Sequence, residues 1–332
     1  MLQLAFGLRF AELYETAGLA RLDASFCQVL ARADAALAAQ LTTARAAPPS
    51  GKEESALLLA LSPHLERFII ELFGIADDAG RLARAHDELA PLYTTKRQFV
   101  QRKANAKYKA PEAATFDGLA LETALADRFG GRFDELTFAQ HVETWSKDEA
   151  AHAADLDLAM RYAAWALHTE AGREHVHAGI LFKLPAKVDP LHLVNHSETI
   201  ENGTLTSFRI DPAHIRRRDG FALTDAGTDL KGALDQANYC IWCHNQGKDS
   251  CSTGLREKAN PAQPSVVYKK SPFGVPLAGC PLGEKISEFH TAKVEGLPIA
   301  ALALITVDNP MAAATGHRIC NDCMKSCIYQ KQ

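Results

Sequence analysis

The chain has 332 residues, of which 47% are hydrophobic and 23% charged, and its formal net charge is −4. This length allows two domains with a sizeable core, and the composition is that of an ordinary globular protein. The slightly acidic balance argues against a general nucleic-acid or membrane-surface binder, so we expect neither as a partner. No uninterrupted run of 18 apolar residues occurs, so we expect no membrane span.

The N-terminal stretch MLQLAFGLRFAELYETAG does not have the pattern of a secretory signal. Arg9 and Glu12 interrupt its apolar residues, and it lacks a basic first region and a small-residue cleavage site. The spacing of Leu4, Leu8 and Leu13 instead predicts an amphipathic helix. From these features we expect the protein in the cytoplasm.

Residues 1–175 are rich in Ala and Leu, with apolar residues every three to four positions, which predicts helices. Ser50 and Glu53 have the spacing of a capping box, and Ser62-Pro63 has the pattern of a helix start. A helix over 117–129 is expected to stop at Gly130-Gly131. A longer one is expected over about 137–170. It should bury Phe138, Val142, Trp145, Leu156, Tyr162 and Trp165.

Residues 89–116 are more polar and contain Pro91 and Pro111, which predicts a connection. Further along, Asn202-Gly203 separates two short strand-like runs within 197–210. A type I′ turn needs positive φ at both central residues, and this dipeptide adopts it readily, so we expect a β-hairpin. The predicted fold is therefore mainly α, with this small β element. We expect a helical domain over 1–225, of unassigned role, followed by an α-helical domain over 226–332.

The usual catalytic and nucleotide-binding motifs do not occur in the sequence. It has no G-x-G-x-x-G after a strand and no G-x-x-x-x-G-K-[ST], so we expect no flavin or nucleotide site within the chain. It also has no G-x-S-x-G elbow for a serine nucleophile. No catalytic residue is predicted.

Seven of the eight cysteines lie after residue 239, in three groups. In a cytoplasmic protein such a cluster favours metal binding over disulfides. The groups contain Cys240, Cys243 and Cys251, then Cys280, which precedes a proline, and then Cys320, Cys323 and Cys327.

Three kinds of site fit part of this pattern. Cys240–His244 matches the C-x-x-C-H attachment motif of a c-type haem, but that site would leave five cysteines unexplained. A zinc site built from the two C-x-x-C pairs would leave three over. Iron–sulfur ligation uses more of them, because each 4Fe–4S cluster takes four thiolates and a Cys-Pro often supplies a ligand to a second cluster.

Longer pieces of the region add to this interpretation. Cys280-Pro281 is followed by Asn309-Pro310 and by the run from Thr315 to Cys320. This combination, over residues 228–332, resembles the N-terminal iron–sulfur domain shared by dihydropyrimidine dehydrogenase and the small subunit of glutamate synthase.

The resemblance implies an α-helical domain that holds two 4Fe–4S clusters. It implies that one cluster is bound by Cys240, Cys243, Cys251 and Cys327. It implies that Cys280, Cys320 and Cys323 supply three ligands of the other. The implied function is electron transfer within a flavin-dependent, NAD(P)H-linked oxidoreductase, with FAD on a following domain or a partner chain. A zinc-stabilised interaction module remains the alternative, and a c-type cytochrome is a third.

Overall fold

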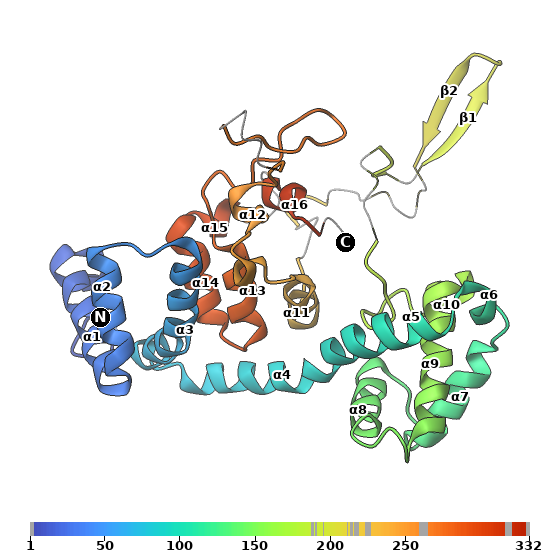
Figure 1. Ribbon diagram of the computed structural model, residues 1–332, viewed down its shortest axis with the longest axis horizontal. Helices are drawn as coiled ribbons and strands as arrows, with labels where there is room; N and C mark the ends of the chain where they lie inside the picture. The colour runs from blue at the N-terminus through green and yellow to red at the C-terminus, as the bar shows by residue number, and fades with distance from the viewer. Residues whose placement is uncertain are drawn as a thin grey trace.

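A computed structural model of the protein describes residues 3–186, 189, 191–194, 196–210, 212, 215, 219–222, 227–258, 265–315 and 321–329. The chain is mainly α-helical and has a small two-stranded antiparallel sheet, which confirms the predicted fold class. Figure 1 shows an elongated arrangement in which one long helical rod, residues 76–107, joins two helical bodies.

The helices of the N-terminal half differ in length from 3 to 23 residues. They are η1 Phe10–Tyr14, α1 Thr16–Ala33, α2 Ala35–Ala46, α3 Gly51–Phe73, α4 Ala76–Thr94, η2 Thr95–Ala104, α5 Asn105–Lys107, α6 Ala110–Ala113, α7 Gly118–Arg128, α8 Glu135–Trp145, α9 Ala153–His168 and α10 Glu170–His175.

The sheet and the shorter C-terminal helices follow. They are β1 Ser197–Glu201, β2 Leu205–Arg209, α11 Leu230–Tyr239, η4 Cys243–Gln246, α12 Ser250–Thr253, α13 Ile286–Val294, α14 Pro298–Asp308, α15 Ala312–Thr315 and α16 Asp322–Ser326.

The N-terminal stretch is not the amphipathic helix that its leucine spacing predicts. Phe6 and Gly7 both have positive φ, and the backbone N–H of Leu4 donates to the carbonyl of Leu8 at 2.8 Å, which closes a tight loop. Leu4 and Leu8 are nevertheless buried, in a small core with Phe68 of α3. The apolar pattern therefore identified the buried residues correctly, but a loop rather than a helix buries them.

Helix α3 has the predicted capping box, in which the side chains of Ser50 and Glu53 each accept a hydrogen bond from the backbone N–H of the other residue. The predicted helix start at Ser62-Pro63 is wrong, because α3 runs through both residues. The Ser62 hydroxyl donates to the Leu58 carbonyl at 2.9 Å and so does not cap the start of a new helix. Proline within a helix costs a backbone hydrogen bond, and here tertiary packing outweighs that cost.

The predicted connection over 89–116 is also wrong. Helix α4 continues through Pro91 into the π-helix η2 and then α5, so the chain is helical from 76 to 107. Pro111 lies in the first turn of α6, where a proline is well tolerated. The segment is polar because much of this rod faces solvent, whereas a narrow side of it, including Phe99 and Val100, is buried.

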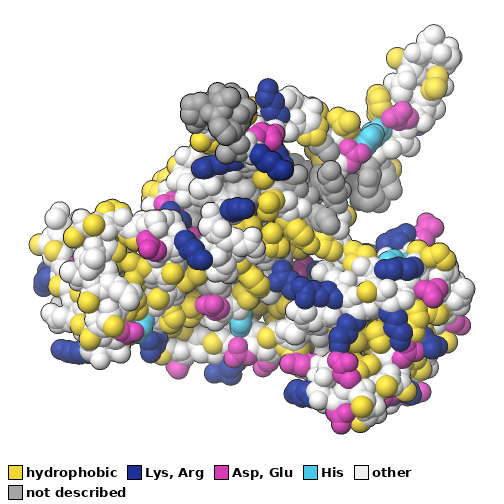
Figure 2. All heavy atoms as spheres, viewed as in Figure 1, with side chains coloured by type: hydrophobic (Ala, Val, Ile, Leu, Met, Phe, Trp, Pro, Cys, Tyr) yellow, Lys and Arg dark blue, Asp and Glu magenta, His cyan; other side chains and the backbone are white. Residues whose placement is uncertain are grey.

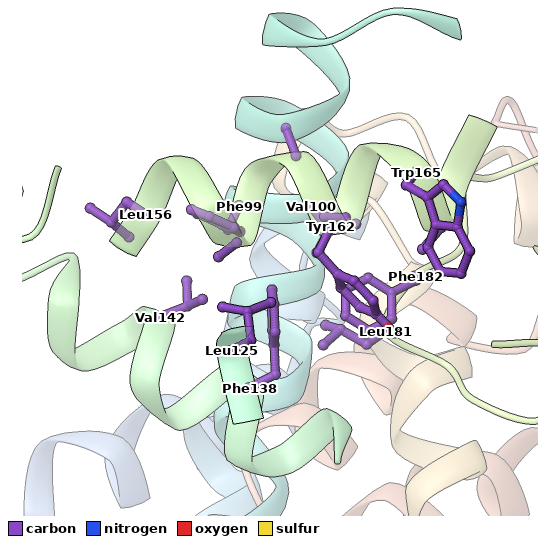
Figure 3. Close-up of a cluster of buried hydrophobic side chains, with 14 of the residues drawn as sticks. Phe99, Val100, Leu125, Phe138, Val142, Leu156, Tyr162, Trp165, Leu181 and Phe182 are labelled. Carbon is purple, nitrogen blue, oxygen red and sulfur yellow. The ribbon is translucent and has the colours of Figure 1, made fainter. Parts of the chain in front are cut away.

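The second helical body packs around η2. Figure 3 shows its aromatic core, to which η2, α7, α8 and α9 contribute. The single helix predicted over 137–170 is two helices, because the chain turns between Trp145 and Ala153. The predicted core is confirmed. Its buried members include Phe138, Val142, Trp145, Leu156, Tyr162 and Trp165. The helix over 118–128 ends before Gly130 and Gly131, both at positive φ, as predicted.

The predicted hairpin is present. Asn202 and Gly203 have φ values of 53° and 72°, and the Thr204 N–H donates to the Glu201 carbonyl at 3.3 Å, which closes the expected turn. Strands β1 and β2 pair antiparallel, with Ser197 opposite Arg209 and Glu201 opposite Leu205. Figure 2 shows the hairpin projecting from the body, with hydrophobic side chains in yellow along it.

The C-terminal helices α13 and α14 pack against α3 through two buried carboxylates. Glu288 of α13 is 2% exposed and accepts a hydrogen bond from the Ser55 hydroxyl of α3 at 2.5 Å. Glu66 of α3 accepts from the backbone N–H of Ala300, in the first turn of α14, at 2.7 Å. A helix N-terminus has unpaired N–H groups and a partial positive charge, so Glu66 caps α14 from a different helix.

Further polar contacts attach the C-terminal third to the rod. The Tyr93 hydroxyl donates to the Lys231 carbonyl at 2.8 Å, and Lys96 forms a partly buried ion pair with Asp235 at 2.6 Å. Figure 1 shows α11 and α13 lying beside α3 and α4. The domain boundary near 225 stays a prediction, and the packing described here joins the C-terminal helices to the N-terminal ones.

Replacing Ser55 by Ala tests the buried Glu288 contact. The substitution removes the hydroxyl that donates to a carboxylate shielded from water, so we expect unfolding to become easier by about 1–3 kcal/mol. Urea unfolding followed by circular dichroism measures the change. Ser25→Ala is the matched control, since the Ser25 hydroxyl donates to the Arg21 carbonyl on an exposed part of α1. An equal effect of the two substitutions would contradict the contact.

His290 of α13 predicts a dependence of stability on pH. Burial lowers the pKa of His290 to about 4, and its Nδ1 has no hydrogen-bond partner among the described residues. The unfolded chain takes up this proton near pH 6.5 while the folded chain resists it, so stability falls as pH drops from about 6.5 towards 4.

His290→Gln should therefore flatten the fall in unfolding free energy between pH 7 and pH 5, measured by urea titration at each pH. The control is His177→Gln, at an exposed histidine after α10. If the two variants keep the same slope as the original chain, His290 does not cause it.

Candidate thiol centre

The first cysteine pair lies where α11 ends. Cys240 is the C-cap of α11, and Trp242 adopts left-handed backbone angles before the short helix η4 begins at Cys243. Left-handed angles are uncommon for a residue other than glycine and often occur at functional sites. The turn brings the Trp242 N–H to 3.4 Å from the Cys240 sulfur, so the backbone donates to the thiol.

Two further segments meet beside this turn. The Cys280 N–H donates to the Cys251 carbonyl at 2.8 Å, which joins the Cys-Pro segment to α12. Helix α12 also packs against α16, which is followed by Cys327. Two serines next to these cysteines fix the contact. The Ser250 hydroxyl accepts from the Ile328 N–H at 3.0 Å, and the Ser326 hydroxyl accepts from the Gly279 N–H at 3.0 Å.

The close approach at this junction depends on Gly279. Its φ is +87°, and a Cβ built there would lie 2.4 Å from the Gly254 nitrogen and 2.7 Å from the Ser252 carbonyl oxygen. Neither the Gly254 nitrogen nor the Ser252 oxygen can move aside easily, because both are backbone atoms. Glycine is therefore required for the loop before Cys280 to lie against α12.

Four thiols, those of Cys240, Cys243, Cys251 and Cys327, influence one another's pKa across the junction. Burial raises the pKa of Cys240, and it raises that of Cys243 to about 11, with the neighbouring Cys327 contributing to both. A hydrogen bond with the Cys327 thiol, followed by burial, raises the pKa of Cys251. Burial also raises the pKa of Asp249 to about 6. At neutral pH the thiols of Cys240, Cys243 and Cys251 are therefore held in the protonated form.

Polar groups from α13 line the centre. The buried His244 places Nδ1 at 2.6 Å from the Ser287 hydroxyl, and burial lowers the pKa of this histidine. The same hydroxyl lies 3.9 Å from the Cys240 sulfur. Ser287 thus contacts Cys240 and His244, the first and last residues of the C-x-x-C-H motif.

The rod supplies the last wall of the centre. Arg97 of η2 donates to the Cys240 carbonyl at 3.2 Å, and its guanidinium carbon lies 4.8 Å from the centre of the Trp242 ring. π-Helical segments are rare and often occur at functional sites. The contact joins the N-terminal rod directly to the cysteine turn.

The structure can be compared with the seven predicted metal ligands. It brings together Cys240, Cys243, Cys251 and Cys327. Of the other three, Cys280 bonds the backbone of Cys251, Cys323 lies in α16, and Cys320 is outside the described residues. Across the part of the chain that is described, no group of three or more His, Cys, Asp or Glu residues is arranged to hold a metal ion. The role of the seven cysteines as ligands stays a prediction.

Sequence reasoning did not single out Ser287, Asp249 or Arg97 as parts of the site. Serine and arginine are common on surfaces, and nothing in their local sequence marks them. Asp249 carried a weak signal, since it stands between two members of the first cysteine group. The contacts of Arg97 and Ser287 arise because α13 and η2, distant in sequence, pack beside the cysteine turn.

Comparison with known proteins places the chain in a family. Residues 4–74 match the model of the RP005 N-terminal alpha-helical domain. The "Uncharacterized protein RP005" of Rickettsia prowazekii (strain Madrid E) is 31% identical over 312 residues, which cover 89% of this chain and 100% of that protein. The chain belongs to the RP005 family.

A second protein of the same organism shares a short segment. The "Uncharacterized protein RP006" is 86% identical over 22 residues, which are 7% of this chain and 3% of that protein. No solved structure matches the chain. No helix in the described ranges is long and apolar enough to cross a membrane.

The family corrects one expectation. The resemblance of residues 228–332 to the iron–sulfur domain of dihydropyrimidine dehydrogenase and glutamate synthase is wrong, because the matches are to RP005. The description of the chain as an iron–sulfur, metal-binding, electron-transfer oxidoreductase is overturned with it. Cys280-Pro281, Asn309-Pro310 and the C-x-x-C pairs are short, and turns in unrelated folds use the same residue types. The comparisons test neither the cofactor nor the partner predictions, which stay predictions.

Arg97→Lys tests the contact between the rod and the cysteine turn. Lysine keeps the charge but loses the planar group that stacks on Trp242 and bonds the Cys240 carbonyl. Losing about 1 kcal/mol of contact should expose the turn about fivefold more often. We therefore expect Cys240 and Cys243 to react about fivefold faster with a thiol alkylating reagent, followed by peptide mass spectrometry.

Arg102→Lys is the control for this experiment. Arg102 lies on the same π-helix and donates to the Gln98 side chain on an exposed surface. Its substitution should leave both alkylation rates unchanged. Equal rates in the Arg97 variant and the original chain would show that Arg97 does not hold the turn.

Proposed function

We propose that this protein is a helical interaction scaffold whose C-terminal segment is fastened by a thiol pair, Cys251 and Cys327, that switches between dithiol and disulfide. The observation that supports it is the convergence of the two cysteines, which have 75 residues between them in the sequence. Hydrogen bonds of the Cys251 carbonyl and of the Ser250 and Ser326 hydroxyls hold their segments together, as described above.

Within the four-thiol group, Cys251 and Cys327 are the favoured pair. Their side chains are joined by a hydrogen bond, whereas Cys240 engages the Trp242 N–H and lies near Ser287. Each of the two also belongs to a different segment, α12 and the end of α16. A bond between them therefore changes how the C-terminal segment is attached.

The chemistry requires an oxidant, for which a low-molecular-weight disulfide such as oxidised glutathione is suitable. One protein thiol, as thiolate, attacks the small disulfide and releases one small thiol, and the second protein thiol then displaces the other. The protein loses two protons and two electrons overall. The small disulfide gains them and becomes two thiols.

The two states differ in how firmly α16 is held. In the dithiol state a thiol hydrogen bond and two serine contacts, each worth about 1 kcal/mol, help to attach it, together with its packing on α12 and the Tyr329 ring against Tyr239. A disulfide that closes a loop of this length restricts the unfolded chain by about 4–5 kcal/mol in the entropic treatment. Oxidation thus adds a covalent link to a segment that only non-covalent contacts held before, which would control access of a partner protein to this surface.

The two thiols differ in how readily they begin the oxidation. A thiolate, and not a thiol, attacks a disulfide, and the hydrogen bond with Cys327 together with burial raises the pKa of Cys251. Cys251 is therefore the poorer nucleophile of the pair, and the first attack on the small disulfide falls to Cys327.

The proposal is tested on the full-length chain, purified in reductant and then exposed to oxidised glutathione. We expect the intact mass to fall by that of two hydrogen atoms, and peptide mapping to find Cys251 joined to Cys327. The melting temperature should rise and should return when reductant is added. Cys251→Ser and Cys327→Ser should each abolish both changes.

Cys27→Ser is the control, since Cys27 lies in α1, in the N-terminal body, next to Arg45. It should behave as the original chain does. A disulfide between other cysteines would overturn the proposal, and so would an unchanged mass. Stoichiometric metal retained on these thiols after purification, measured by elemental analysis, would overturn it as well.

A further inference from the structure

A basic loop projects from the molecule beside α12. It consists of residues 255–258 and 265–277, and backbone hydrogen bonds join the two pieces, such as that from the Lys269 N–H to the Leu255 carbonyl at 2.8 Å. Figure 1 shows this loop in orange, above α12 and α16. A tight turn over 271–276 forms its tip.

The loop is a basic surface on an acidic chain. Its four basic residues, Arg256, Lys258, Lys269 and Lys270, are all exposed, and Glu257 is its one acidic residue. The net charge of −4, which argues against a membrane-surface binder, is an average over the whole chain and does not describe this loop. A surface of negative charge is therefore the complementary partner for the loop.

The tip adds apolar side chains to this charge. Phe273 is 65% exposed and Val275 is 59% exposed. Two exposed prolines, Pro272 and Pro276, stand beside them. Lys270 pairs with Pro276 through a backbone bridge at the base of the tip, so cations follow directly behind the apolar residues.

The backbone donors of the tip are satisfied from within. The Ser271 N–H donates to the Val275 carbonyl at 2.8 Å, and the Gly274 N–H donates to the Ser271 carbonyl at 2.9 Å. The Ser271 hydroxyl accepts from the N–H groups of Phe273 and Val275, each at 3.3 Å. The two prolines have no N–H. Every N–H over 271–276 is therefore bonded or absent, which lowers the cost of placing this backbone in an apolar phase.

We propose that the basic loop docks the protein on a membrane surface that contains anionic lipid. The four cations attract the headgroups, while Phe273 and Val275 leave water for the boundary between headgroups and acyl chains. A nucleic acid would attract the same cations, but it offers no apolar phase for Val275 and the two prolines. Docking of this kind does not depend on the proposed thiol switch.

Cosedimentation of the full-length chain with vesicles tests the proposal, with reductant present throughout so that the thiols stay reduced. We expect binding to vesicles of phosphatidylcholine with phosphatidylserine, and little binding to phosphatidylcholine alone. Binding should weaken as salt is raised.

Two sets of variants separate charge from insertion. Lys269→Gln combined with Lys270→Gln should weaken binding by about 25-fold, since each cation near such a surface contributes about fivefold. Phe273→Ser should weaken it by about tenfold and leave its dependence on salt unchanged. Circular dichroism checks that each variant is folded, and Val275→Ser takes the place of Phe273→Ser should that variant unfold.

Two controls are matched to these variants. Lys52→Gln combined with Lys147→Gln removes the same charge from exposed lysines of α3 and of the turn after α8. Phe208→Ser removes a phenylalanine that is 64% exposed, on the β-hairpin. Both controls should bind vesicles as the original chain does.

Several outcomes would overturn the proposal. These are absence of vesicle binding, equal binding without the anionic lipid, and a control that weakens binding as much as its counterpart in the loop. Binding that the lysine variant weakens but the Phe273 variant does not would indicate attraction to charge alone, as to a nucleic acid, and would overturn it too.

Discussion

The structure depends on burying two carboxylates where α13 and α14 meet α3. A carboxylate removed from water is costly unless hydrogen bonds replace its hydration, so Glu288 and Glu66 tolerate only positions that provide donors. Ser55 provides one for Glu288, whose second oxygen has no hydrogen-bond partner among the described residues, and the first turn of α14 provides one for Glu66. Sliding one helix along the other would leave both carboxylates unpaired. These contacts therefore fix the register in which the C-terminal third docks.

The same docking positions the thiol centre. Ser287 precedes Glu288 in α13, and once the carboxylate is fixed this serine faces His244 and the sulfur of Cys240. On the opposite side, the π-helix of the rod places Arg97 against the turn. The centre thus lies between α13 of the C-terminal third and η2 of the N-terminal half, so both parts of the chain contribute to it.

The thiol centre and the hairpin differ in what they bury. The centre buries polarisable thiols, whereas the hairpin leaves apolar side chains exposed. In the centre, thiols are kept protonated by burial and by one another, and a glycine allows backbone to approach backbone. In the hairpin, apolar side chains project into solvent from a sheet too small to cover them. Each departs from what folding by itself favours, and such departures are typical of surfaces and sites that act on something else.

Local rules account for what the sequence by itself determined: the capping box at Ser50, the helix stop at Gly130, the Asn202-Gly203 turn and the buried aromatic residues. Each depends on a few neighbouring residues or on helical periodicity. The tertiary structure decided the rest. Packing carried helices through Pro63 and Pro91, because buried contacts along a long helix outweigh one lost hydrogen bond. The chemistry around the cysteines was also decided there, since Ser287 and Arg97 reach them from helices far away in sequence. A short cysteine motif indicates the local turn that contains it. It does not indicate the family or the partners, because those depend on the whole packed chain.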